Sequence, residues 1–225
     1  MSDTLKTPGR PQRRGFTLIE LLIVIAIILI LIAIALPNFL EAQIRAKVAR
    51  VEADLRTIVT ALETYFIDWG TYPMQSEDEF DTDAHGLSQL TTPLQYLPEL
   101  PFDVFVGSQS HAVDGVPVYF EMASTAIEAN LAPFLGGPPL NIHAYALYSH
   151  GPDVIDDFDG EGDWPFGGAA PQCFDGIVTW TYSPTNGTRS KGDIQRFGGE
   201  WKTGHWCLNG LEIAGRGFDC PPNCS

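Results

Sequence analysis

Basic side chains are missing from the middle of this 225-residue chain, because no lysine or arginine occurs between Arg56 and Arg189. Over the whole sequence, 13 lysines and arginines stand against 28 aspartates and glutamates, which gives a formal net charge of −15. So acidic a body repels phosphate groups, which disfavours nucleic acids and anionic lipid surfaces as its partners. We therefore expect the folded part to bind no nucleic acid.

The usual signatures of catalysis are also missing. The sequence contains no Gly-x-Ser-x-Gly elbow, no phosphate-binding loop and no His-Glu-x-x-His motif. Carboxylates are plentiful, but a pair for glycoside hydrolysis needs a defined separation across a cleft, which sequence spacing does not provide. The sequence predicts a protein that is not an enzyme.

Cysteine is scarce and confined to the last quarter of the chain. The four positions are Cys173, Cys207, Cys220 and Cys224. An even number in an exported protein predicts two disulfides, for which three connectivities are possible. A cytosolic zinc site is the alternative, but Cys220 and Cys224 have no paired histidine.

One long apolar run lies near the N-terminus. Leu21 to Leu36 are sixteen consecutive apolar residues, and from Phe16 onward only Thr17 and Glu20 interrupt the run. As a helix it would extend about 30 Å, the thickness of the hydrocarbon core of a bilayer. Because lysine and arginine cluster just before it, we expect a single pass through the inner membrane, with residues 1–15 cytoplasmic and the body periplasmic.

Two cleaved export signals are alternatives to a permanent anchor. Residues 33–35 read Ala-Ile-Ala, a cleavage-like triplet, and Arg13-Arg14 faintly resembles a twin-arginine signal. Neither alternative explains Glu20, since a carboxylate in an apolar helix costs roughly 2.5–3.5 kcal/mol at the bilayer centre.

The sequence around Glu20 suggests a use for this carboxylate. Residues 13–22 read RRGFTLIELL and resemble the class III signal of type IV prepilins and of type II secretion pseudopilins. The resemblance implies cleavage between Gly15 and Phe16 by a prepilin peptidase, N-methylation of Phe16, and pairing of Glu20 with the terminal amine of a neighbouring subunit. A buried carboxylate and ammonium are each tolerable when paired. The alternative is an ordinary anchor with an isolated glutamate.

An amphipathic pattern follows the apolar run. Apolar residues recur at alternating spacings of four and three, which predicts a helix with one buried face: Ile44, Val48, Val51, Leu55, Ile58, Leu62, Tyr65 and Trp69. Pro37 is expected to kink or locally melt the helix, which Gly70 and Pro73 then end. We favour packing against a sheet over a coiled-coil seam. Residues 61–73 also resemble the Ala-x-x-x-Tyr…Gly-x-Tyr-Pro junction of major, G-type pseudopilins.

The rest of the sequence predicts short strands and loops. Strand candidates are Val116–Met122, His143–Ser149 and Ile177–Ser183, and residues 86–97 suggest a short helix. With the resemblance, this predicts an α+β, pilin-like fold: a long N-terminal helix packed on a small antiparallel sheet, with a loop-rich C-terminal region. The expected parts are a leader (1–15), a transmembrane or filament-core helix (16–37), an amphipathic helix (38–72) and a head (73–225) with an acidic loop (149–163) and a cysteine-bearing tail (196–225).

The acidic loop has the composition of a metal site. Six aspartates and glutamates occur between Asp153 and Asp163 among glycines, and such a loop suits calcium, although its spacing is not that of an EF-hand. Residues 149–153 and 192–194 resemble the two halves of the calcium loop of G-type pseudopilins. That match implies Asp153 and Asp193 as ligands, with less certain roles for Asp156, Asp157 and Asp159. About forty residues separate the two halves, and a merely solvated loop is the alternative.

Two classes of function remain open. One is a structural subunit of a type II secretion pseudopilus, a homopolymer whose implied partners are the prepilin peptidase, an inner-membrane assembly platform and minor pseudopilins. The other is a type IV pilin or minor pilin that acts in adhesion, motility or uptake.

His150 adjoins the acidic loop and could bind zinc there, although one imidazole is weak evidence.

Overall fold

The computed structural model describes residues 16–75, 86–105, 120–126, 142–158, 164–165, 178–187, 190–203 and 205–214. The chain divides into two compact units, Met1–Ala42 and Gln43–Ser225. One long helix, α1 (Leu18–Trp69), contributes to both.

The first unit consists, in its described part, of the apolar beginning of α1. Every residue from Phe16 to Ala42 is exposed. The helix continues unbroken through Pro37, so the local melting expected there does not occur. A proline removes one backbone hydrogen bond, and the turns on either side keep theirs.

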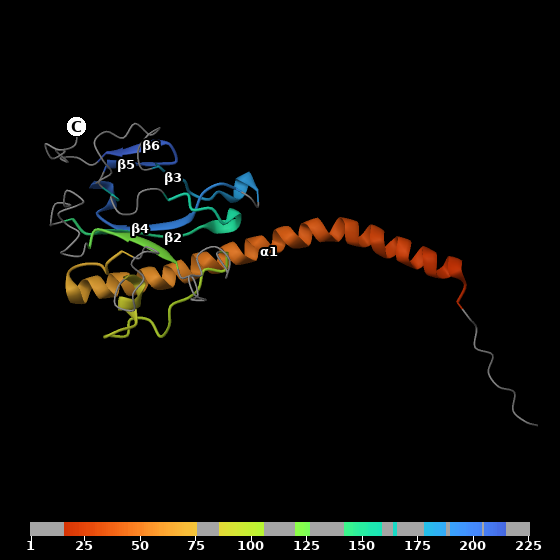
Figure 1. The fold of residues 1–225 in the computed structure, drawn as a ribbon, viewed down its shortest axis with the longest axis horizontal. Coiled ribbons are helices and arrows are strands. Elements are labelled where there is room, and N and C mark those ends of the chain that lie inside the picture. Colours follow the sequence, from red (N-terminus) through yellow and green to blue (C-terminus); the bar gives the residue numbers. More distant parts are fainter. Residues whose placement is uncertain are drawn as a thin grey trace, which may run out of the picture. The chain divides into compact units, whose positions relative to one another are not determined.

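The second unit is built in layers on the remainder of α1. Figure 1 shows the sheet of β1, β2 and β4 lying between this helix segment and a second sheet of β3, β5 and β6. The predicted α+β, pilin-like organisation is confirmed. The helix ends at Trp69, before Gly70, as the sequence predicts, and Gly70 has φ +70°.

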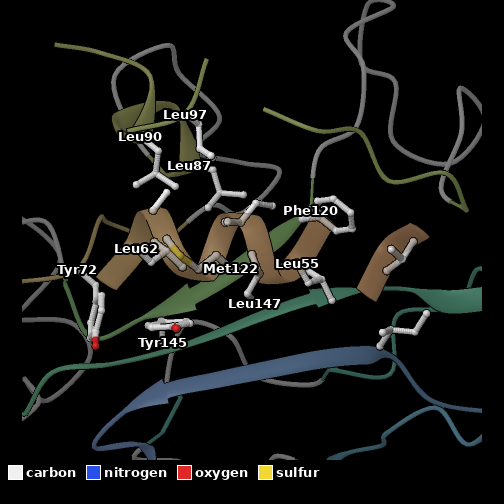
Figure 2. Close-up of a cluster of buried hydrophobic side chains, with 14 residues drawn as sticks. Leu55, Leu62, Tyr72, Leu87, Leu90, Leu97, Phe120, Met122, Tyr145 and Leu147 are labelled. Carbon is white, nitrogen blue, oxygen red and sulfur yellow. The ribbon is translucent and has the colours of Figure 1, made fainter. Parts of the chain in front are cut away.

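One face of α1 is the centre of the first hydrophobic cluster. Its fully buried residues include Val51, Leu55, Ile58 and Leu62, which confirms the predicted stripe. Figure 2 shows the helix between Leu87, Leu90 and Leu97 on one side and Met122, Tyr145 and Leu147 of the sheet on the other. The stripe is wrong at its last position, because Trp69 is 52% exposed.

The first sheet has three antiparallel strands in the order β1-β2-β4. They are β1 (Glu121–Ser124), β2 (Ala144–Ser149) and β4 (Ile194–Gly199). The second predicted strand is confirmed as β2, and β1 overlaps the C-terminal end of the first predicted strand, whose residues 116–119 lie outside the described residues. The third strand is β4 and not the predicted segment 177–183. The glycines and charge of β4 hide it from an alternation pattern.

The second sheet covers the face of the first sheet that points away from α1. Its strands are β3 (Val178–Thr179), β5 (His205–Leu208) and β6 (Leu211–Ala214). β3 pairs parallel with β5, and of the described residues 178–183 of the predicted strand only Val178 and Thr179 form a strand, in this sheet. Between the sheets lies a second hydrophobic cluster that includes Tyr148, Phe158, Trp164 and Trp206.

Short 3-10 turns connect these elements. They are η1 (Gly86–Leu90), η3 (Gly151–Asp153), η4 (Pro184–Asn186) and η5 (Trp201–Thr203). The predicted short helix at 86–97 is thus a single 3-10 turn followed by bends, as the prolines after Thr92 favour.

Candidate assembly residues and acidic cluster

Glu20 closes a capping box at the start of α1. Its Oε2 accepts hydrogen bonds from the backbone N–H of Thr17 at 2.8 Å and from the hydroxyl of Thr17 at 2.7 Å, and its own N–H donates to that hydroxyl at 3.3 Å. This reciprocal pairing satisfies backbone donors that the first helical turn leaves free. No hydrogen bond from the described residues reaches Oε1, which leaves that oxygen available to a further donor.

The helix that Glu20 begins is the candidate membrane span. Within the described residues, α1 is the one helix long and apolar enough to cross a bilayer. Its apolar side chains from Leu18 to Leu40 are exposed in the isolated chain. An apolar surface of this length requires lipid or other helices as its surroundings. Phe16 is exposed just before the helix, and Gly15 lies outside the described residues.

The structure brings the two halves of the predicted calcium loop together. The backbone N–H of Gly192 donates to Oδ2 of Asp157 at 2.8 Å, and the N–H of Asp157 donates to Oδ2 of Asp193 at 3.2 Å. Gly151 approaches this segment so closely that a Cβ there would lie 3.2 Å from the carbonyl oxygen of Gly192. The segment of about forty residues between the halves does not separate them.

These contacts place five ionisable residues close together at the ends of β1, β2 and β4. We call them the acidic cluster: Glu121, His150, Asp156, Asp157 and Asp193. Sequence reasoning missed Glu121, which lies about thirty positions before the loop. It joins the cluster because β1 pairs with β2, so that Glu121 lies opposite Tyr148. His150 lies two residues further along the chain.

Burial makes the electrostatics of this cluster unusual. Asp193 is fully buried, and its burial, followed by the nearby Asp156 carboxylate, raises its pKa to about 9. Burial alone would lower the pKa of His150, but Glu121 at 3.0 Å, together with Asp156 and Asp193, raises it to about 9. With a pKa of about 9 the Asp193 carboxyl is protonated at neutral pH, so a cation that binds there has to displace this proton.

The other predicted ligands lie at the edge of this cluster. Asp153 ends η3, where its Oδ1 accepts a hydrogen bond from the N–H of Ile155 at 3.5 Å, and within the described residues no hydrogen bond joins it to Asp193. Asp156 accepts from the N–H of Phe158 at 2.8 Å. Lys191 approaches Asp157 at 3.4 Å from solvent. Asp159 lies outside the described residues.

The chemistry of the cluster suits a cation. Where the two segments meet, the carboxylates of Asp157 and Asp193 each accept a backbone hydrogen bond from the opposite segment, and oxygen ligands are what calcium prefers. Asp157, rather than Asp153, is hydrogen-bonded to Asp193, through its backbone N–H, and Asp156 is the carboxylate that acts most strongly on the charge of Asp193.

The cysteines contribute a covalent link to the second sheet. Cys207 on β5 is fully buried and disulfide-bonded. Cys173, Cys220 and Cys224 lie outside the described residues, so the predicted connectivity stays a prediction.

Comparison of the sequence with known proteins identifies relatives of this chain. A family model described as the prokaryotic N-terminal methylation motif matches residues 10–36, the segment that contains Gly15, Phe16 and Glu20. Over 116 residues the chain is 34% identical to the fimbrial protein EcpB of Eikenella corrodens, an alignment that covers 48% of this chain and 69% of that protein. The chain belongs to the type IV pilin-like family.

Other relatives of this pilin-like chain come from two systems. It is 48% identical over 62 residues to the type IV major pilin protein PilA of Myxococcus xanthus, which covers 28% of each chain. It is 33% identical over 90 residues to the type II secretion system core protein G of Klebsiella michiganensis, which covers 40% of this chain and 58% of that protein. In both comparisons the match spans less than two thirds of the relative. No solved structure matches the chain significantly.

Proposed function

We propose that the mature chain, beginning at Phe16, is a structural subunit of a type II secretion pseudopilus. The carrying observation is the exposed apolar stretch of α1 with Glu20 at its start, because such a surface needs neighbouring helices in a filament core. The 90-residue match to a secretion system core protein G extends this similarity beyond the methylation motif.

In this proposal Glu20 links one subunit to the next. Its Oε2 is held by Thr17 of its own chain, and its Oε1 accepts from the terminal amine of Phe16 in the adjacent subunit. Before assembly the same helix anchors the subunit in the inner membrane, with the head in the periplasm. Prepilin peptidase, the assembly platform and minor pseudopilins are the partners that this route requires.

A calcium ion bound in the head is part of the same proposal. Asp157 and Asp193 would hold it, with Asp153 at the rim, and the ion would neutralise carboxylates that burial otherwise penalises. The ion supplies no chemistry beyond this neutralisation. Hydrogen bonds of Asp157 with Gly192 and Asp193 connect the start of β4 to the loop that follows β2.

The system can be identified by deleting the gene in the bacterium that encodes it. Loss of secreted proteins from the medium, with surface pili and surface motility retained, is the expected result. Intact-mass analysis of the filaments should give a chain that starts at an N-methylated Phe16. A chain that starts at Met1 or Leu36 would contradict the processing that this function needs.

A type IV pilus is the second candidate, and the 48% identity to a major pilin over 62 residues favours it. In that case the deletion removes surface pili and leaves secretion intact. The two outcomes exclude each other as long as the host has separate subunits for the two systems.

A further inference from the structure

We propose that Glu121, His150 and Asp156 form a site for a divalent transition metal, with zinc as the probe, distinct from the calcium position at Asp157 and Asp193. One atom from each of these three side chains lies within 4.8 Å of the others. The set combines one imidazole nitrogen with two carboxylates. Calcium takes oxygen ligands, whereas zinc is commonly held by histidine together with aspartate or glutamate.

The backbone of the sheet fixes two of the ligands. In the β1–β2 register Glu121 lies opposite Tyr148, so His150 is its diagonal neighbour on the same face of the sheet. His150 Nε2 and Glu121 Oε1 are 3.0 Å apart. Two ligands of one tetrahedral zinc ion are roughly 3.4 Å apart, so a small outward movement would admit the ion between them.

The surroundings hold the imidazole in place. The side chain of His150 is only 3% exposed and stacks on Tyr148 with ring centroids 6.4 Å apart. Tyr148 in turn stacks on Phe158 at 4.5 Å. An imidazole locked by packing loses little conformational entropy when it binds a metal, which favours tight binding.

The third ligand provides an entry path. Asp156 is exposed, in contrast to His150, so an ion can reach the site from solvent on the side of the loop. The fourth coordination position of a zinc ion would face this side and hold water.

The charge near the site is not fully compensated. Asp103 is 4% exposed, and its Oδ2 makes no hydrogen bond with the described residues. Burial raises the pKa of Asp103, and hydrogen bonds from Ser149 and from the N–H of Phe105, followed by the nearby His150, oppose that rise. A divalent cation between His150 and Glu121 would add positive charge near the buried Asp103.

The test uses the full chain in detergent micelles, with disulfides intact and metals removed by chelation. Zinc chloride is titrated while binding is measured by competition with a chromogenic chelator. We expect one zinc ion per chain. His150→Gln and Glu121→Gln should each weaken binding at least about 100-fold, since even outer partners of a metal ligand cost about 10–100-fold. The matched controls His143→Gln and Glu99→Gln should leave binding unchanged.

X-ray absorption at the zinc edge on the wild-type chain tests the ligands without any variant. The expected shell is nitrogen and oxygen with the scattering pattern of one imidazole. A sulfur shell would assign the zinc to cysteines and overturn the proposal, as would an oxygen-only shell, absence of zinc binding, or binding that survives His150→Gln in folded protein. Displacement of zinc by equimolar calcium would also overturn it, because the two ions would then share one site.

Discussion

Glu20 has one carboxylate oxygen engaged by Thr17 and the other open to a donor from outside the chain. In the proposed filament, this division would let one residue begin the helix through Oε2 and join the next subunit through Oε1.

Replacing Glu20 by alanine should abolish filament formation. The terminal amine of the adjacent subunit would then lie in the apolar filament core without a counter-charge, and breaking a buried pair in this way costs about 3–5 kcal/mol. Membrane insertion and cleavage should persist, since the apolar run is intact. Fractionation followed by the yield of sheared filaments measures both, with Glu41→Ala as the control. Wild-type yields of the Glu20→Ala filament would refute the pairing.

A second carboxylate stabilises the head from within. Glu63 on α1 accepts hydrogen bonds from the hydroxyl of Tyr145 at 3.1 Å and from that of Tyr72 at 3.3 Å. Both tyrosines are almost fully buried, and burial, with Glu63 nearby, raises the pKa of both phenols. One carboxylate thus satisfies two phenols at the junction of helix and sheet.

Glu63→Ala should lower the free energy of unfolding by about 1–3 kcal/mol, because it leaves two buried hydroxyls unsatisfied. Urea denaturation followed by circular dichroism measures this. Adding Tyr72→Phe and Tyr145→Phe to the same chain should recover much of the loss, since no polar group is then stranded. Equal stability of the single and triple variants would show that the hydroxyls find other partners.

At the scale of elements, α1 carries two kinds of apolar residue in its second half. Leu62 is fully buried between the sheet and η1, whereas Ile67 is 81% exposed. They lie only five residues apart on one helix and differ in surroundings rather than in chemistry.

Leu62→Ala should therefore destabilise the head by about 2–5 kcal/mol, the cost of a cavity in a packed core. Ile67→Ala is the matched control and should change the free energy of unfolding by at most about 0.5 kcal/mol. Chemical denaturation of both variants in the same detergent decides between them. Similar losses in the two would contradict the packing of this helix face.

The helix was predictable from sequence because its apolar residues recur with helical period over several turns. Strand β4 was not predictable in that way, because glycines, a glutamine and an arginine interrupt its apolar residues. The hairpin of β5 and β6 had a readable signal that sequence reasoning passed over. Asn209 and Gly210 both have positive φ, as a type I′ turn requires, and Asn-Gly is its commonest sequence.

At the scale of the whole molecule, the acidic cluster depends on contacts that no local pattern encodes. The sequence predicted Asp193 from a short motif. It could not pair Asp193 with Asp157, because these residues meet through hydrogen bonds between the loop after β2 and the residues before β4. Nor could it bring in Glu121, which the pairing of β1 with β2 places beside His150. Which side chains meet in the acidic cluster therefore depends on strand register and on loop contacts.

Calcium should raise the melting temperature of the full chain in detergent relative to chelator, with disulfides kept intact. An ion that binds only the folded state adds about 2.7 kcal/mol at a hundredfold excess over Kd. Asp157→Asn and Asp193→Asn should each remove the shift, while Glu99→Gln should keep it. A thermal melt by circular dichroism measures all four chains. No shift in wild type, or a shift that survives both substitutions, would show that these aspartates do not bind calcium.

The two hydrophobic clusters also differ in their chromophores. The first cluster contains the buried tyrosines Tyr72 and Tyr145, whereas the buried tryptophans in the described residues, Trp164 and Trp206, lie in the second. Fluorescence excited at wavelengths that tryptophan absorbs and tyrosine does not therefore reports mainly on the layer far from α1. The far-ultraviolet circular dichroism of the chain is dominated by the helix. If both signals change together during denaturation, the two layers unfold as one cooperative unit. If they separate, each layer has a stability of its own, and the wild-type chain reveals it without any attached dye.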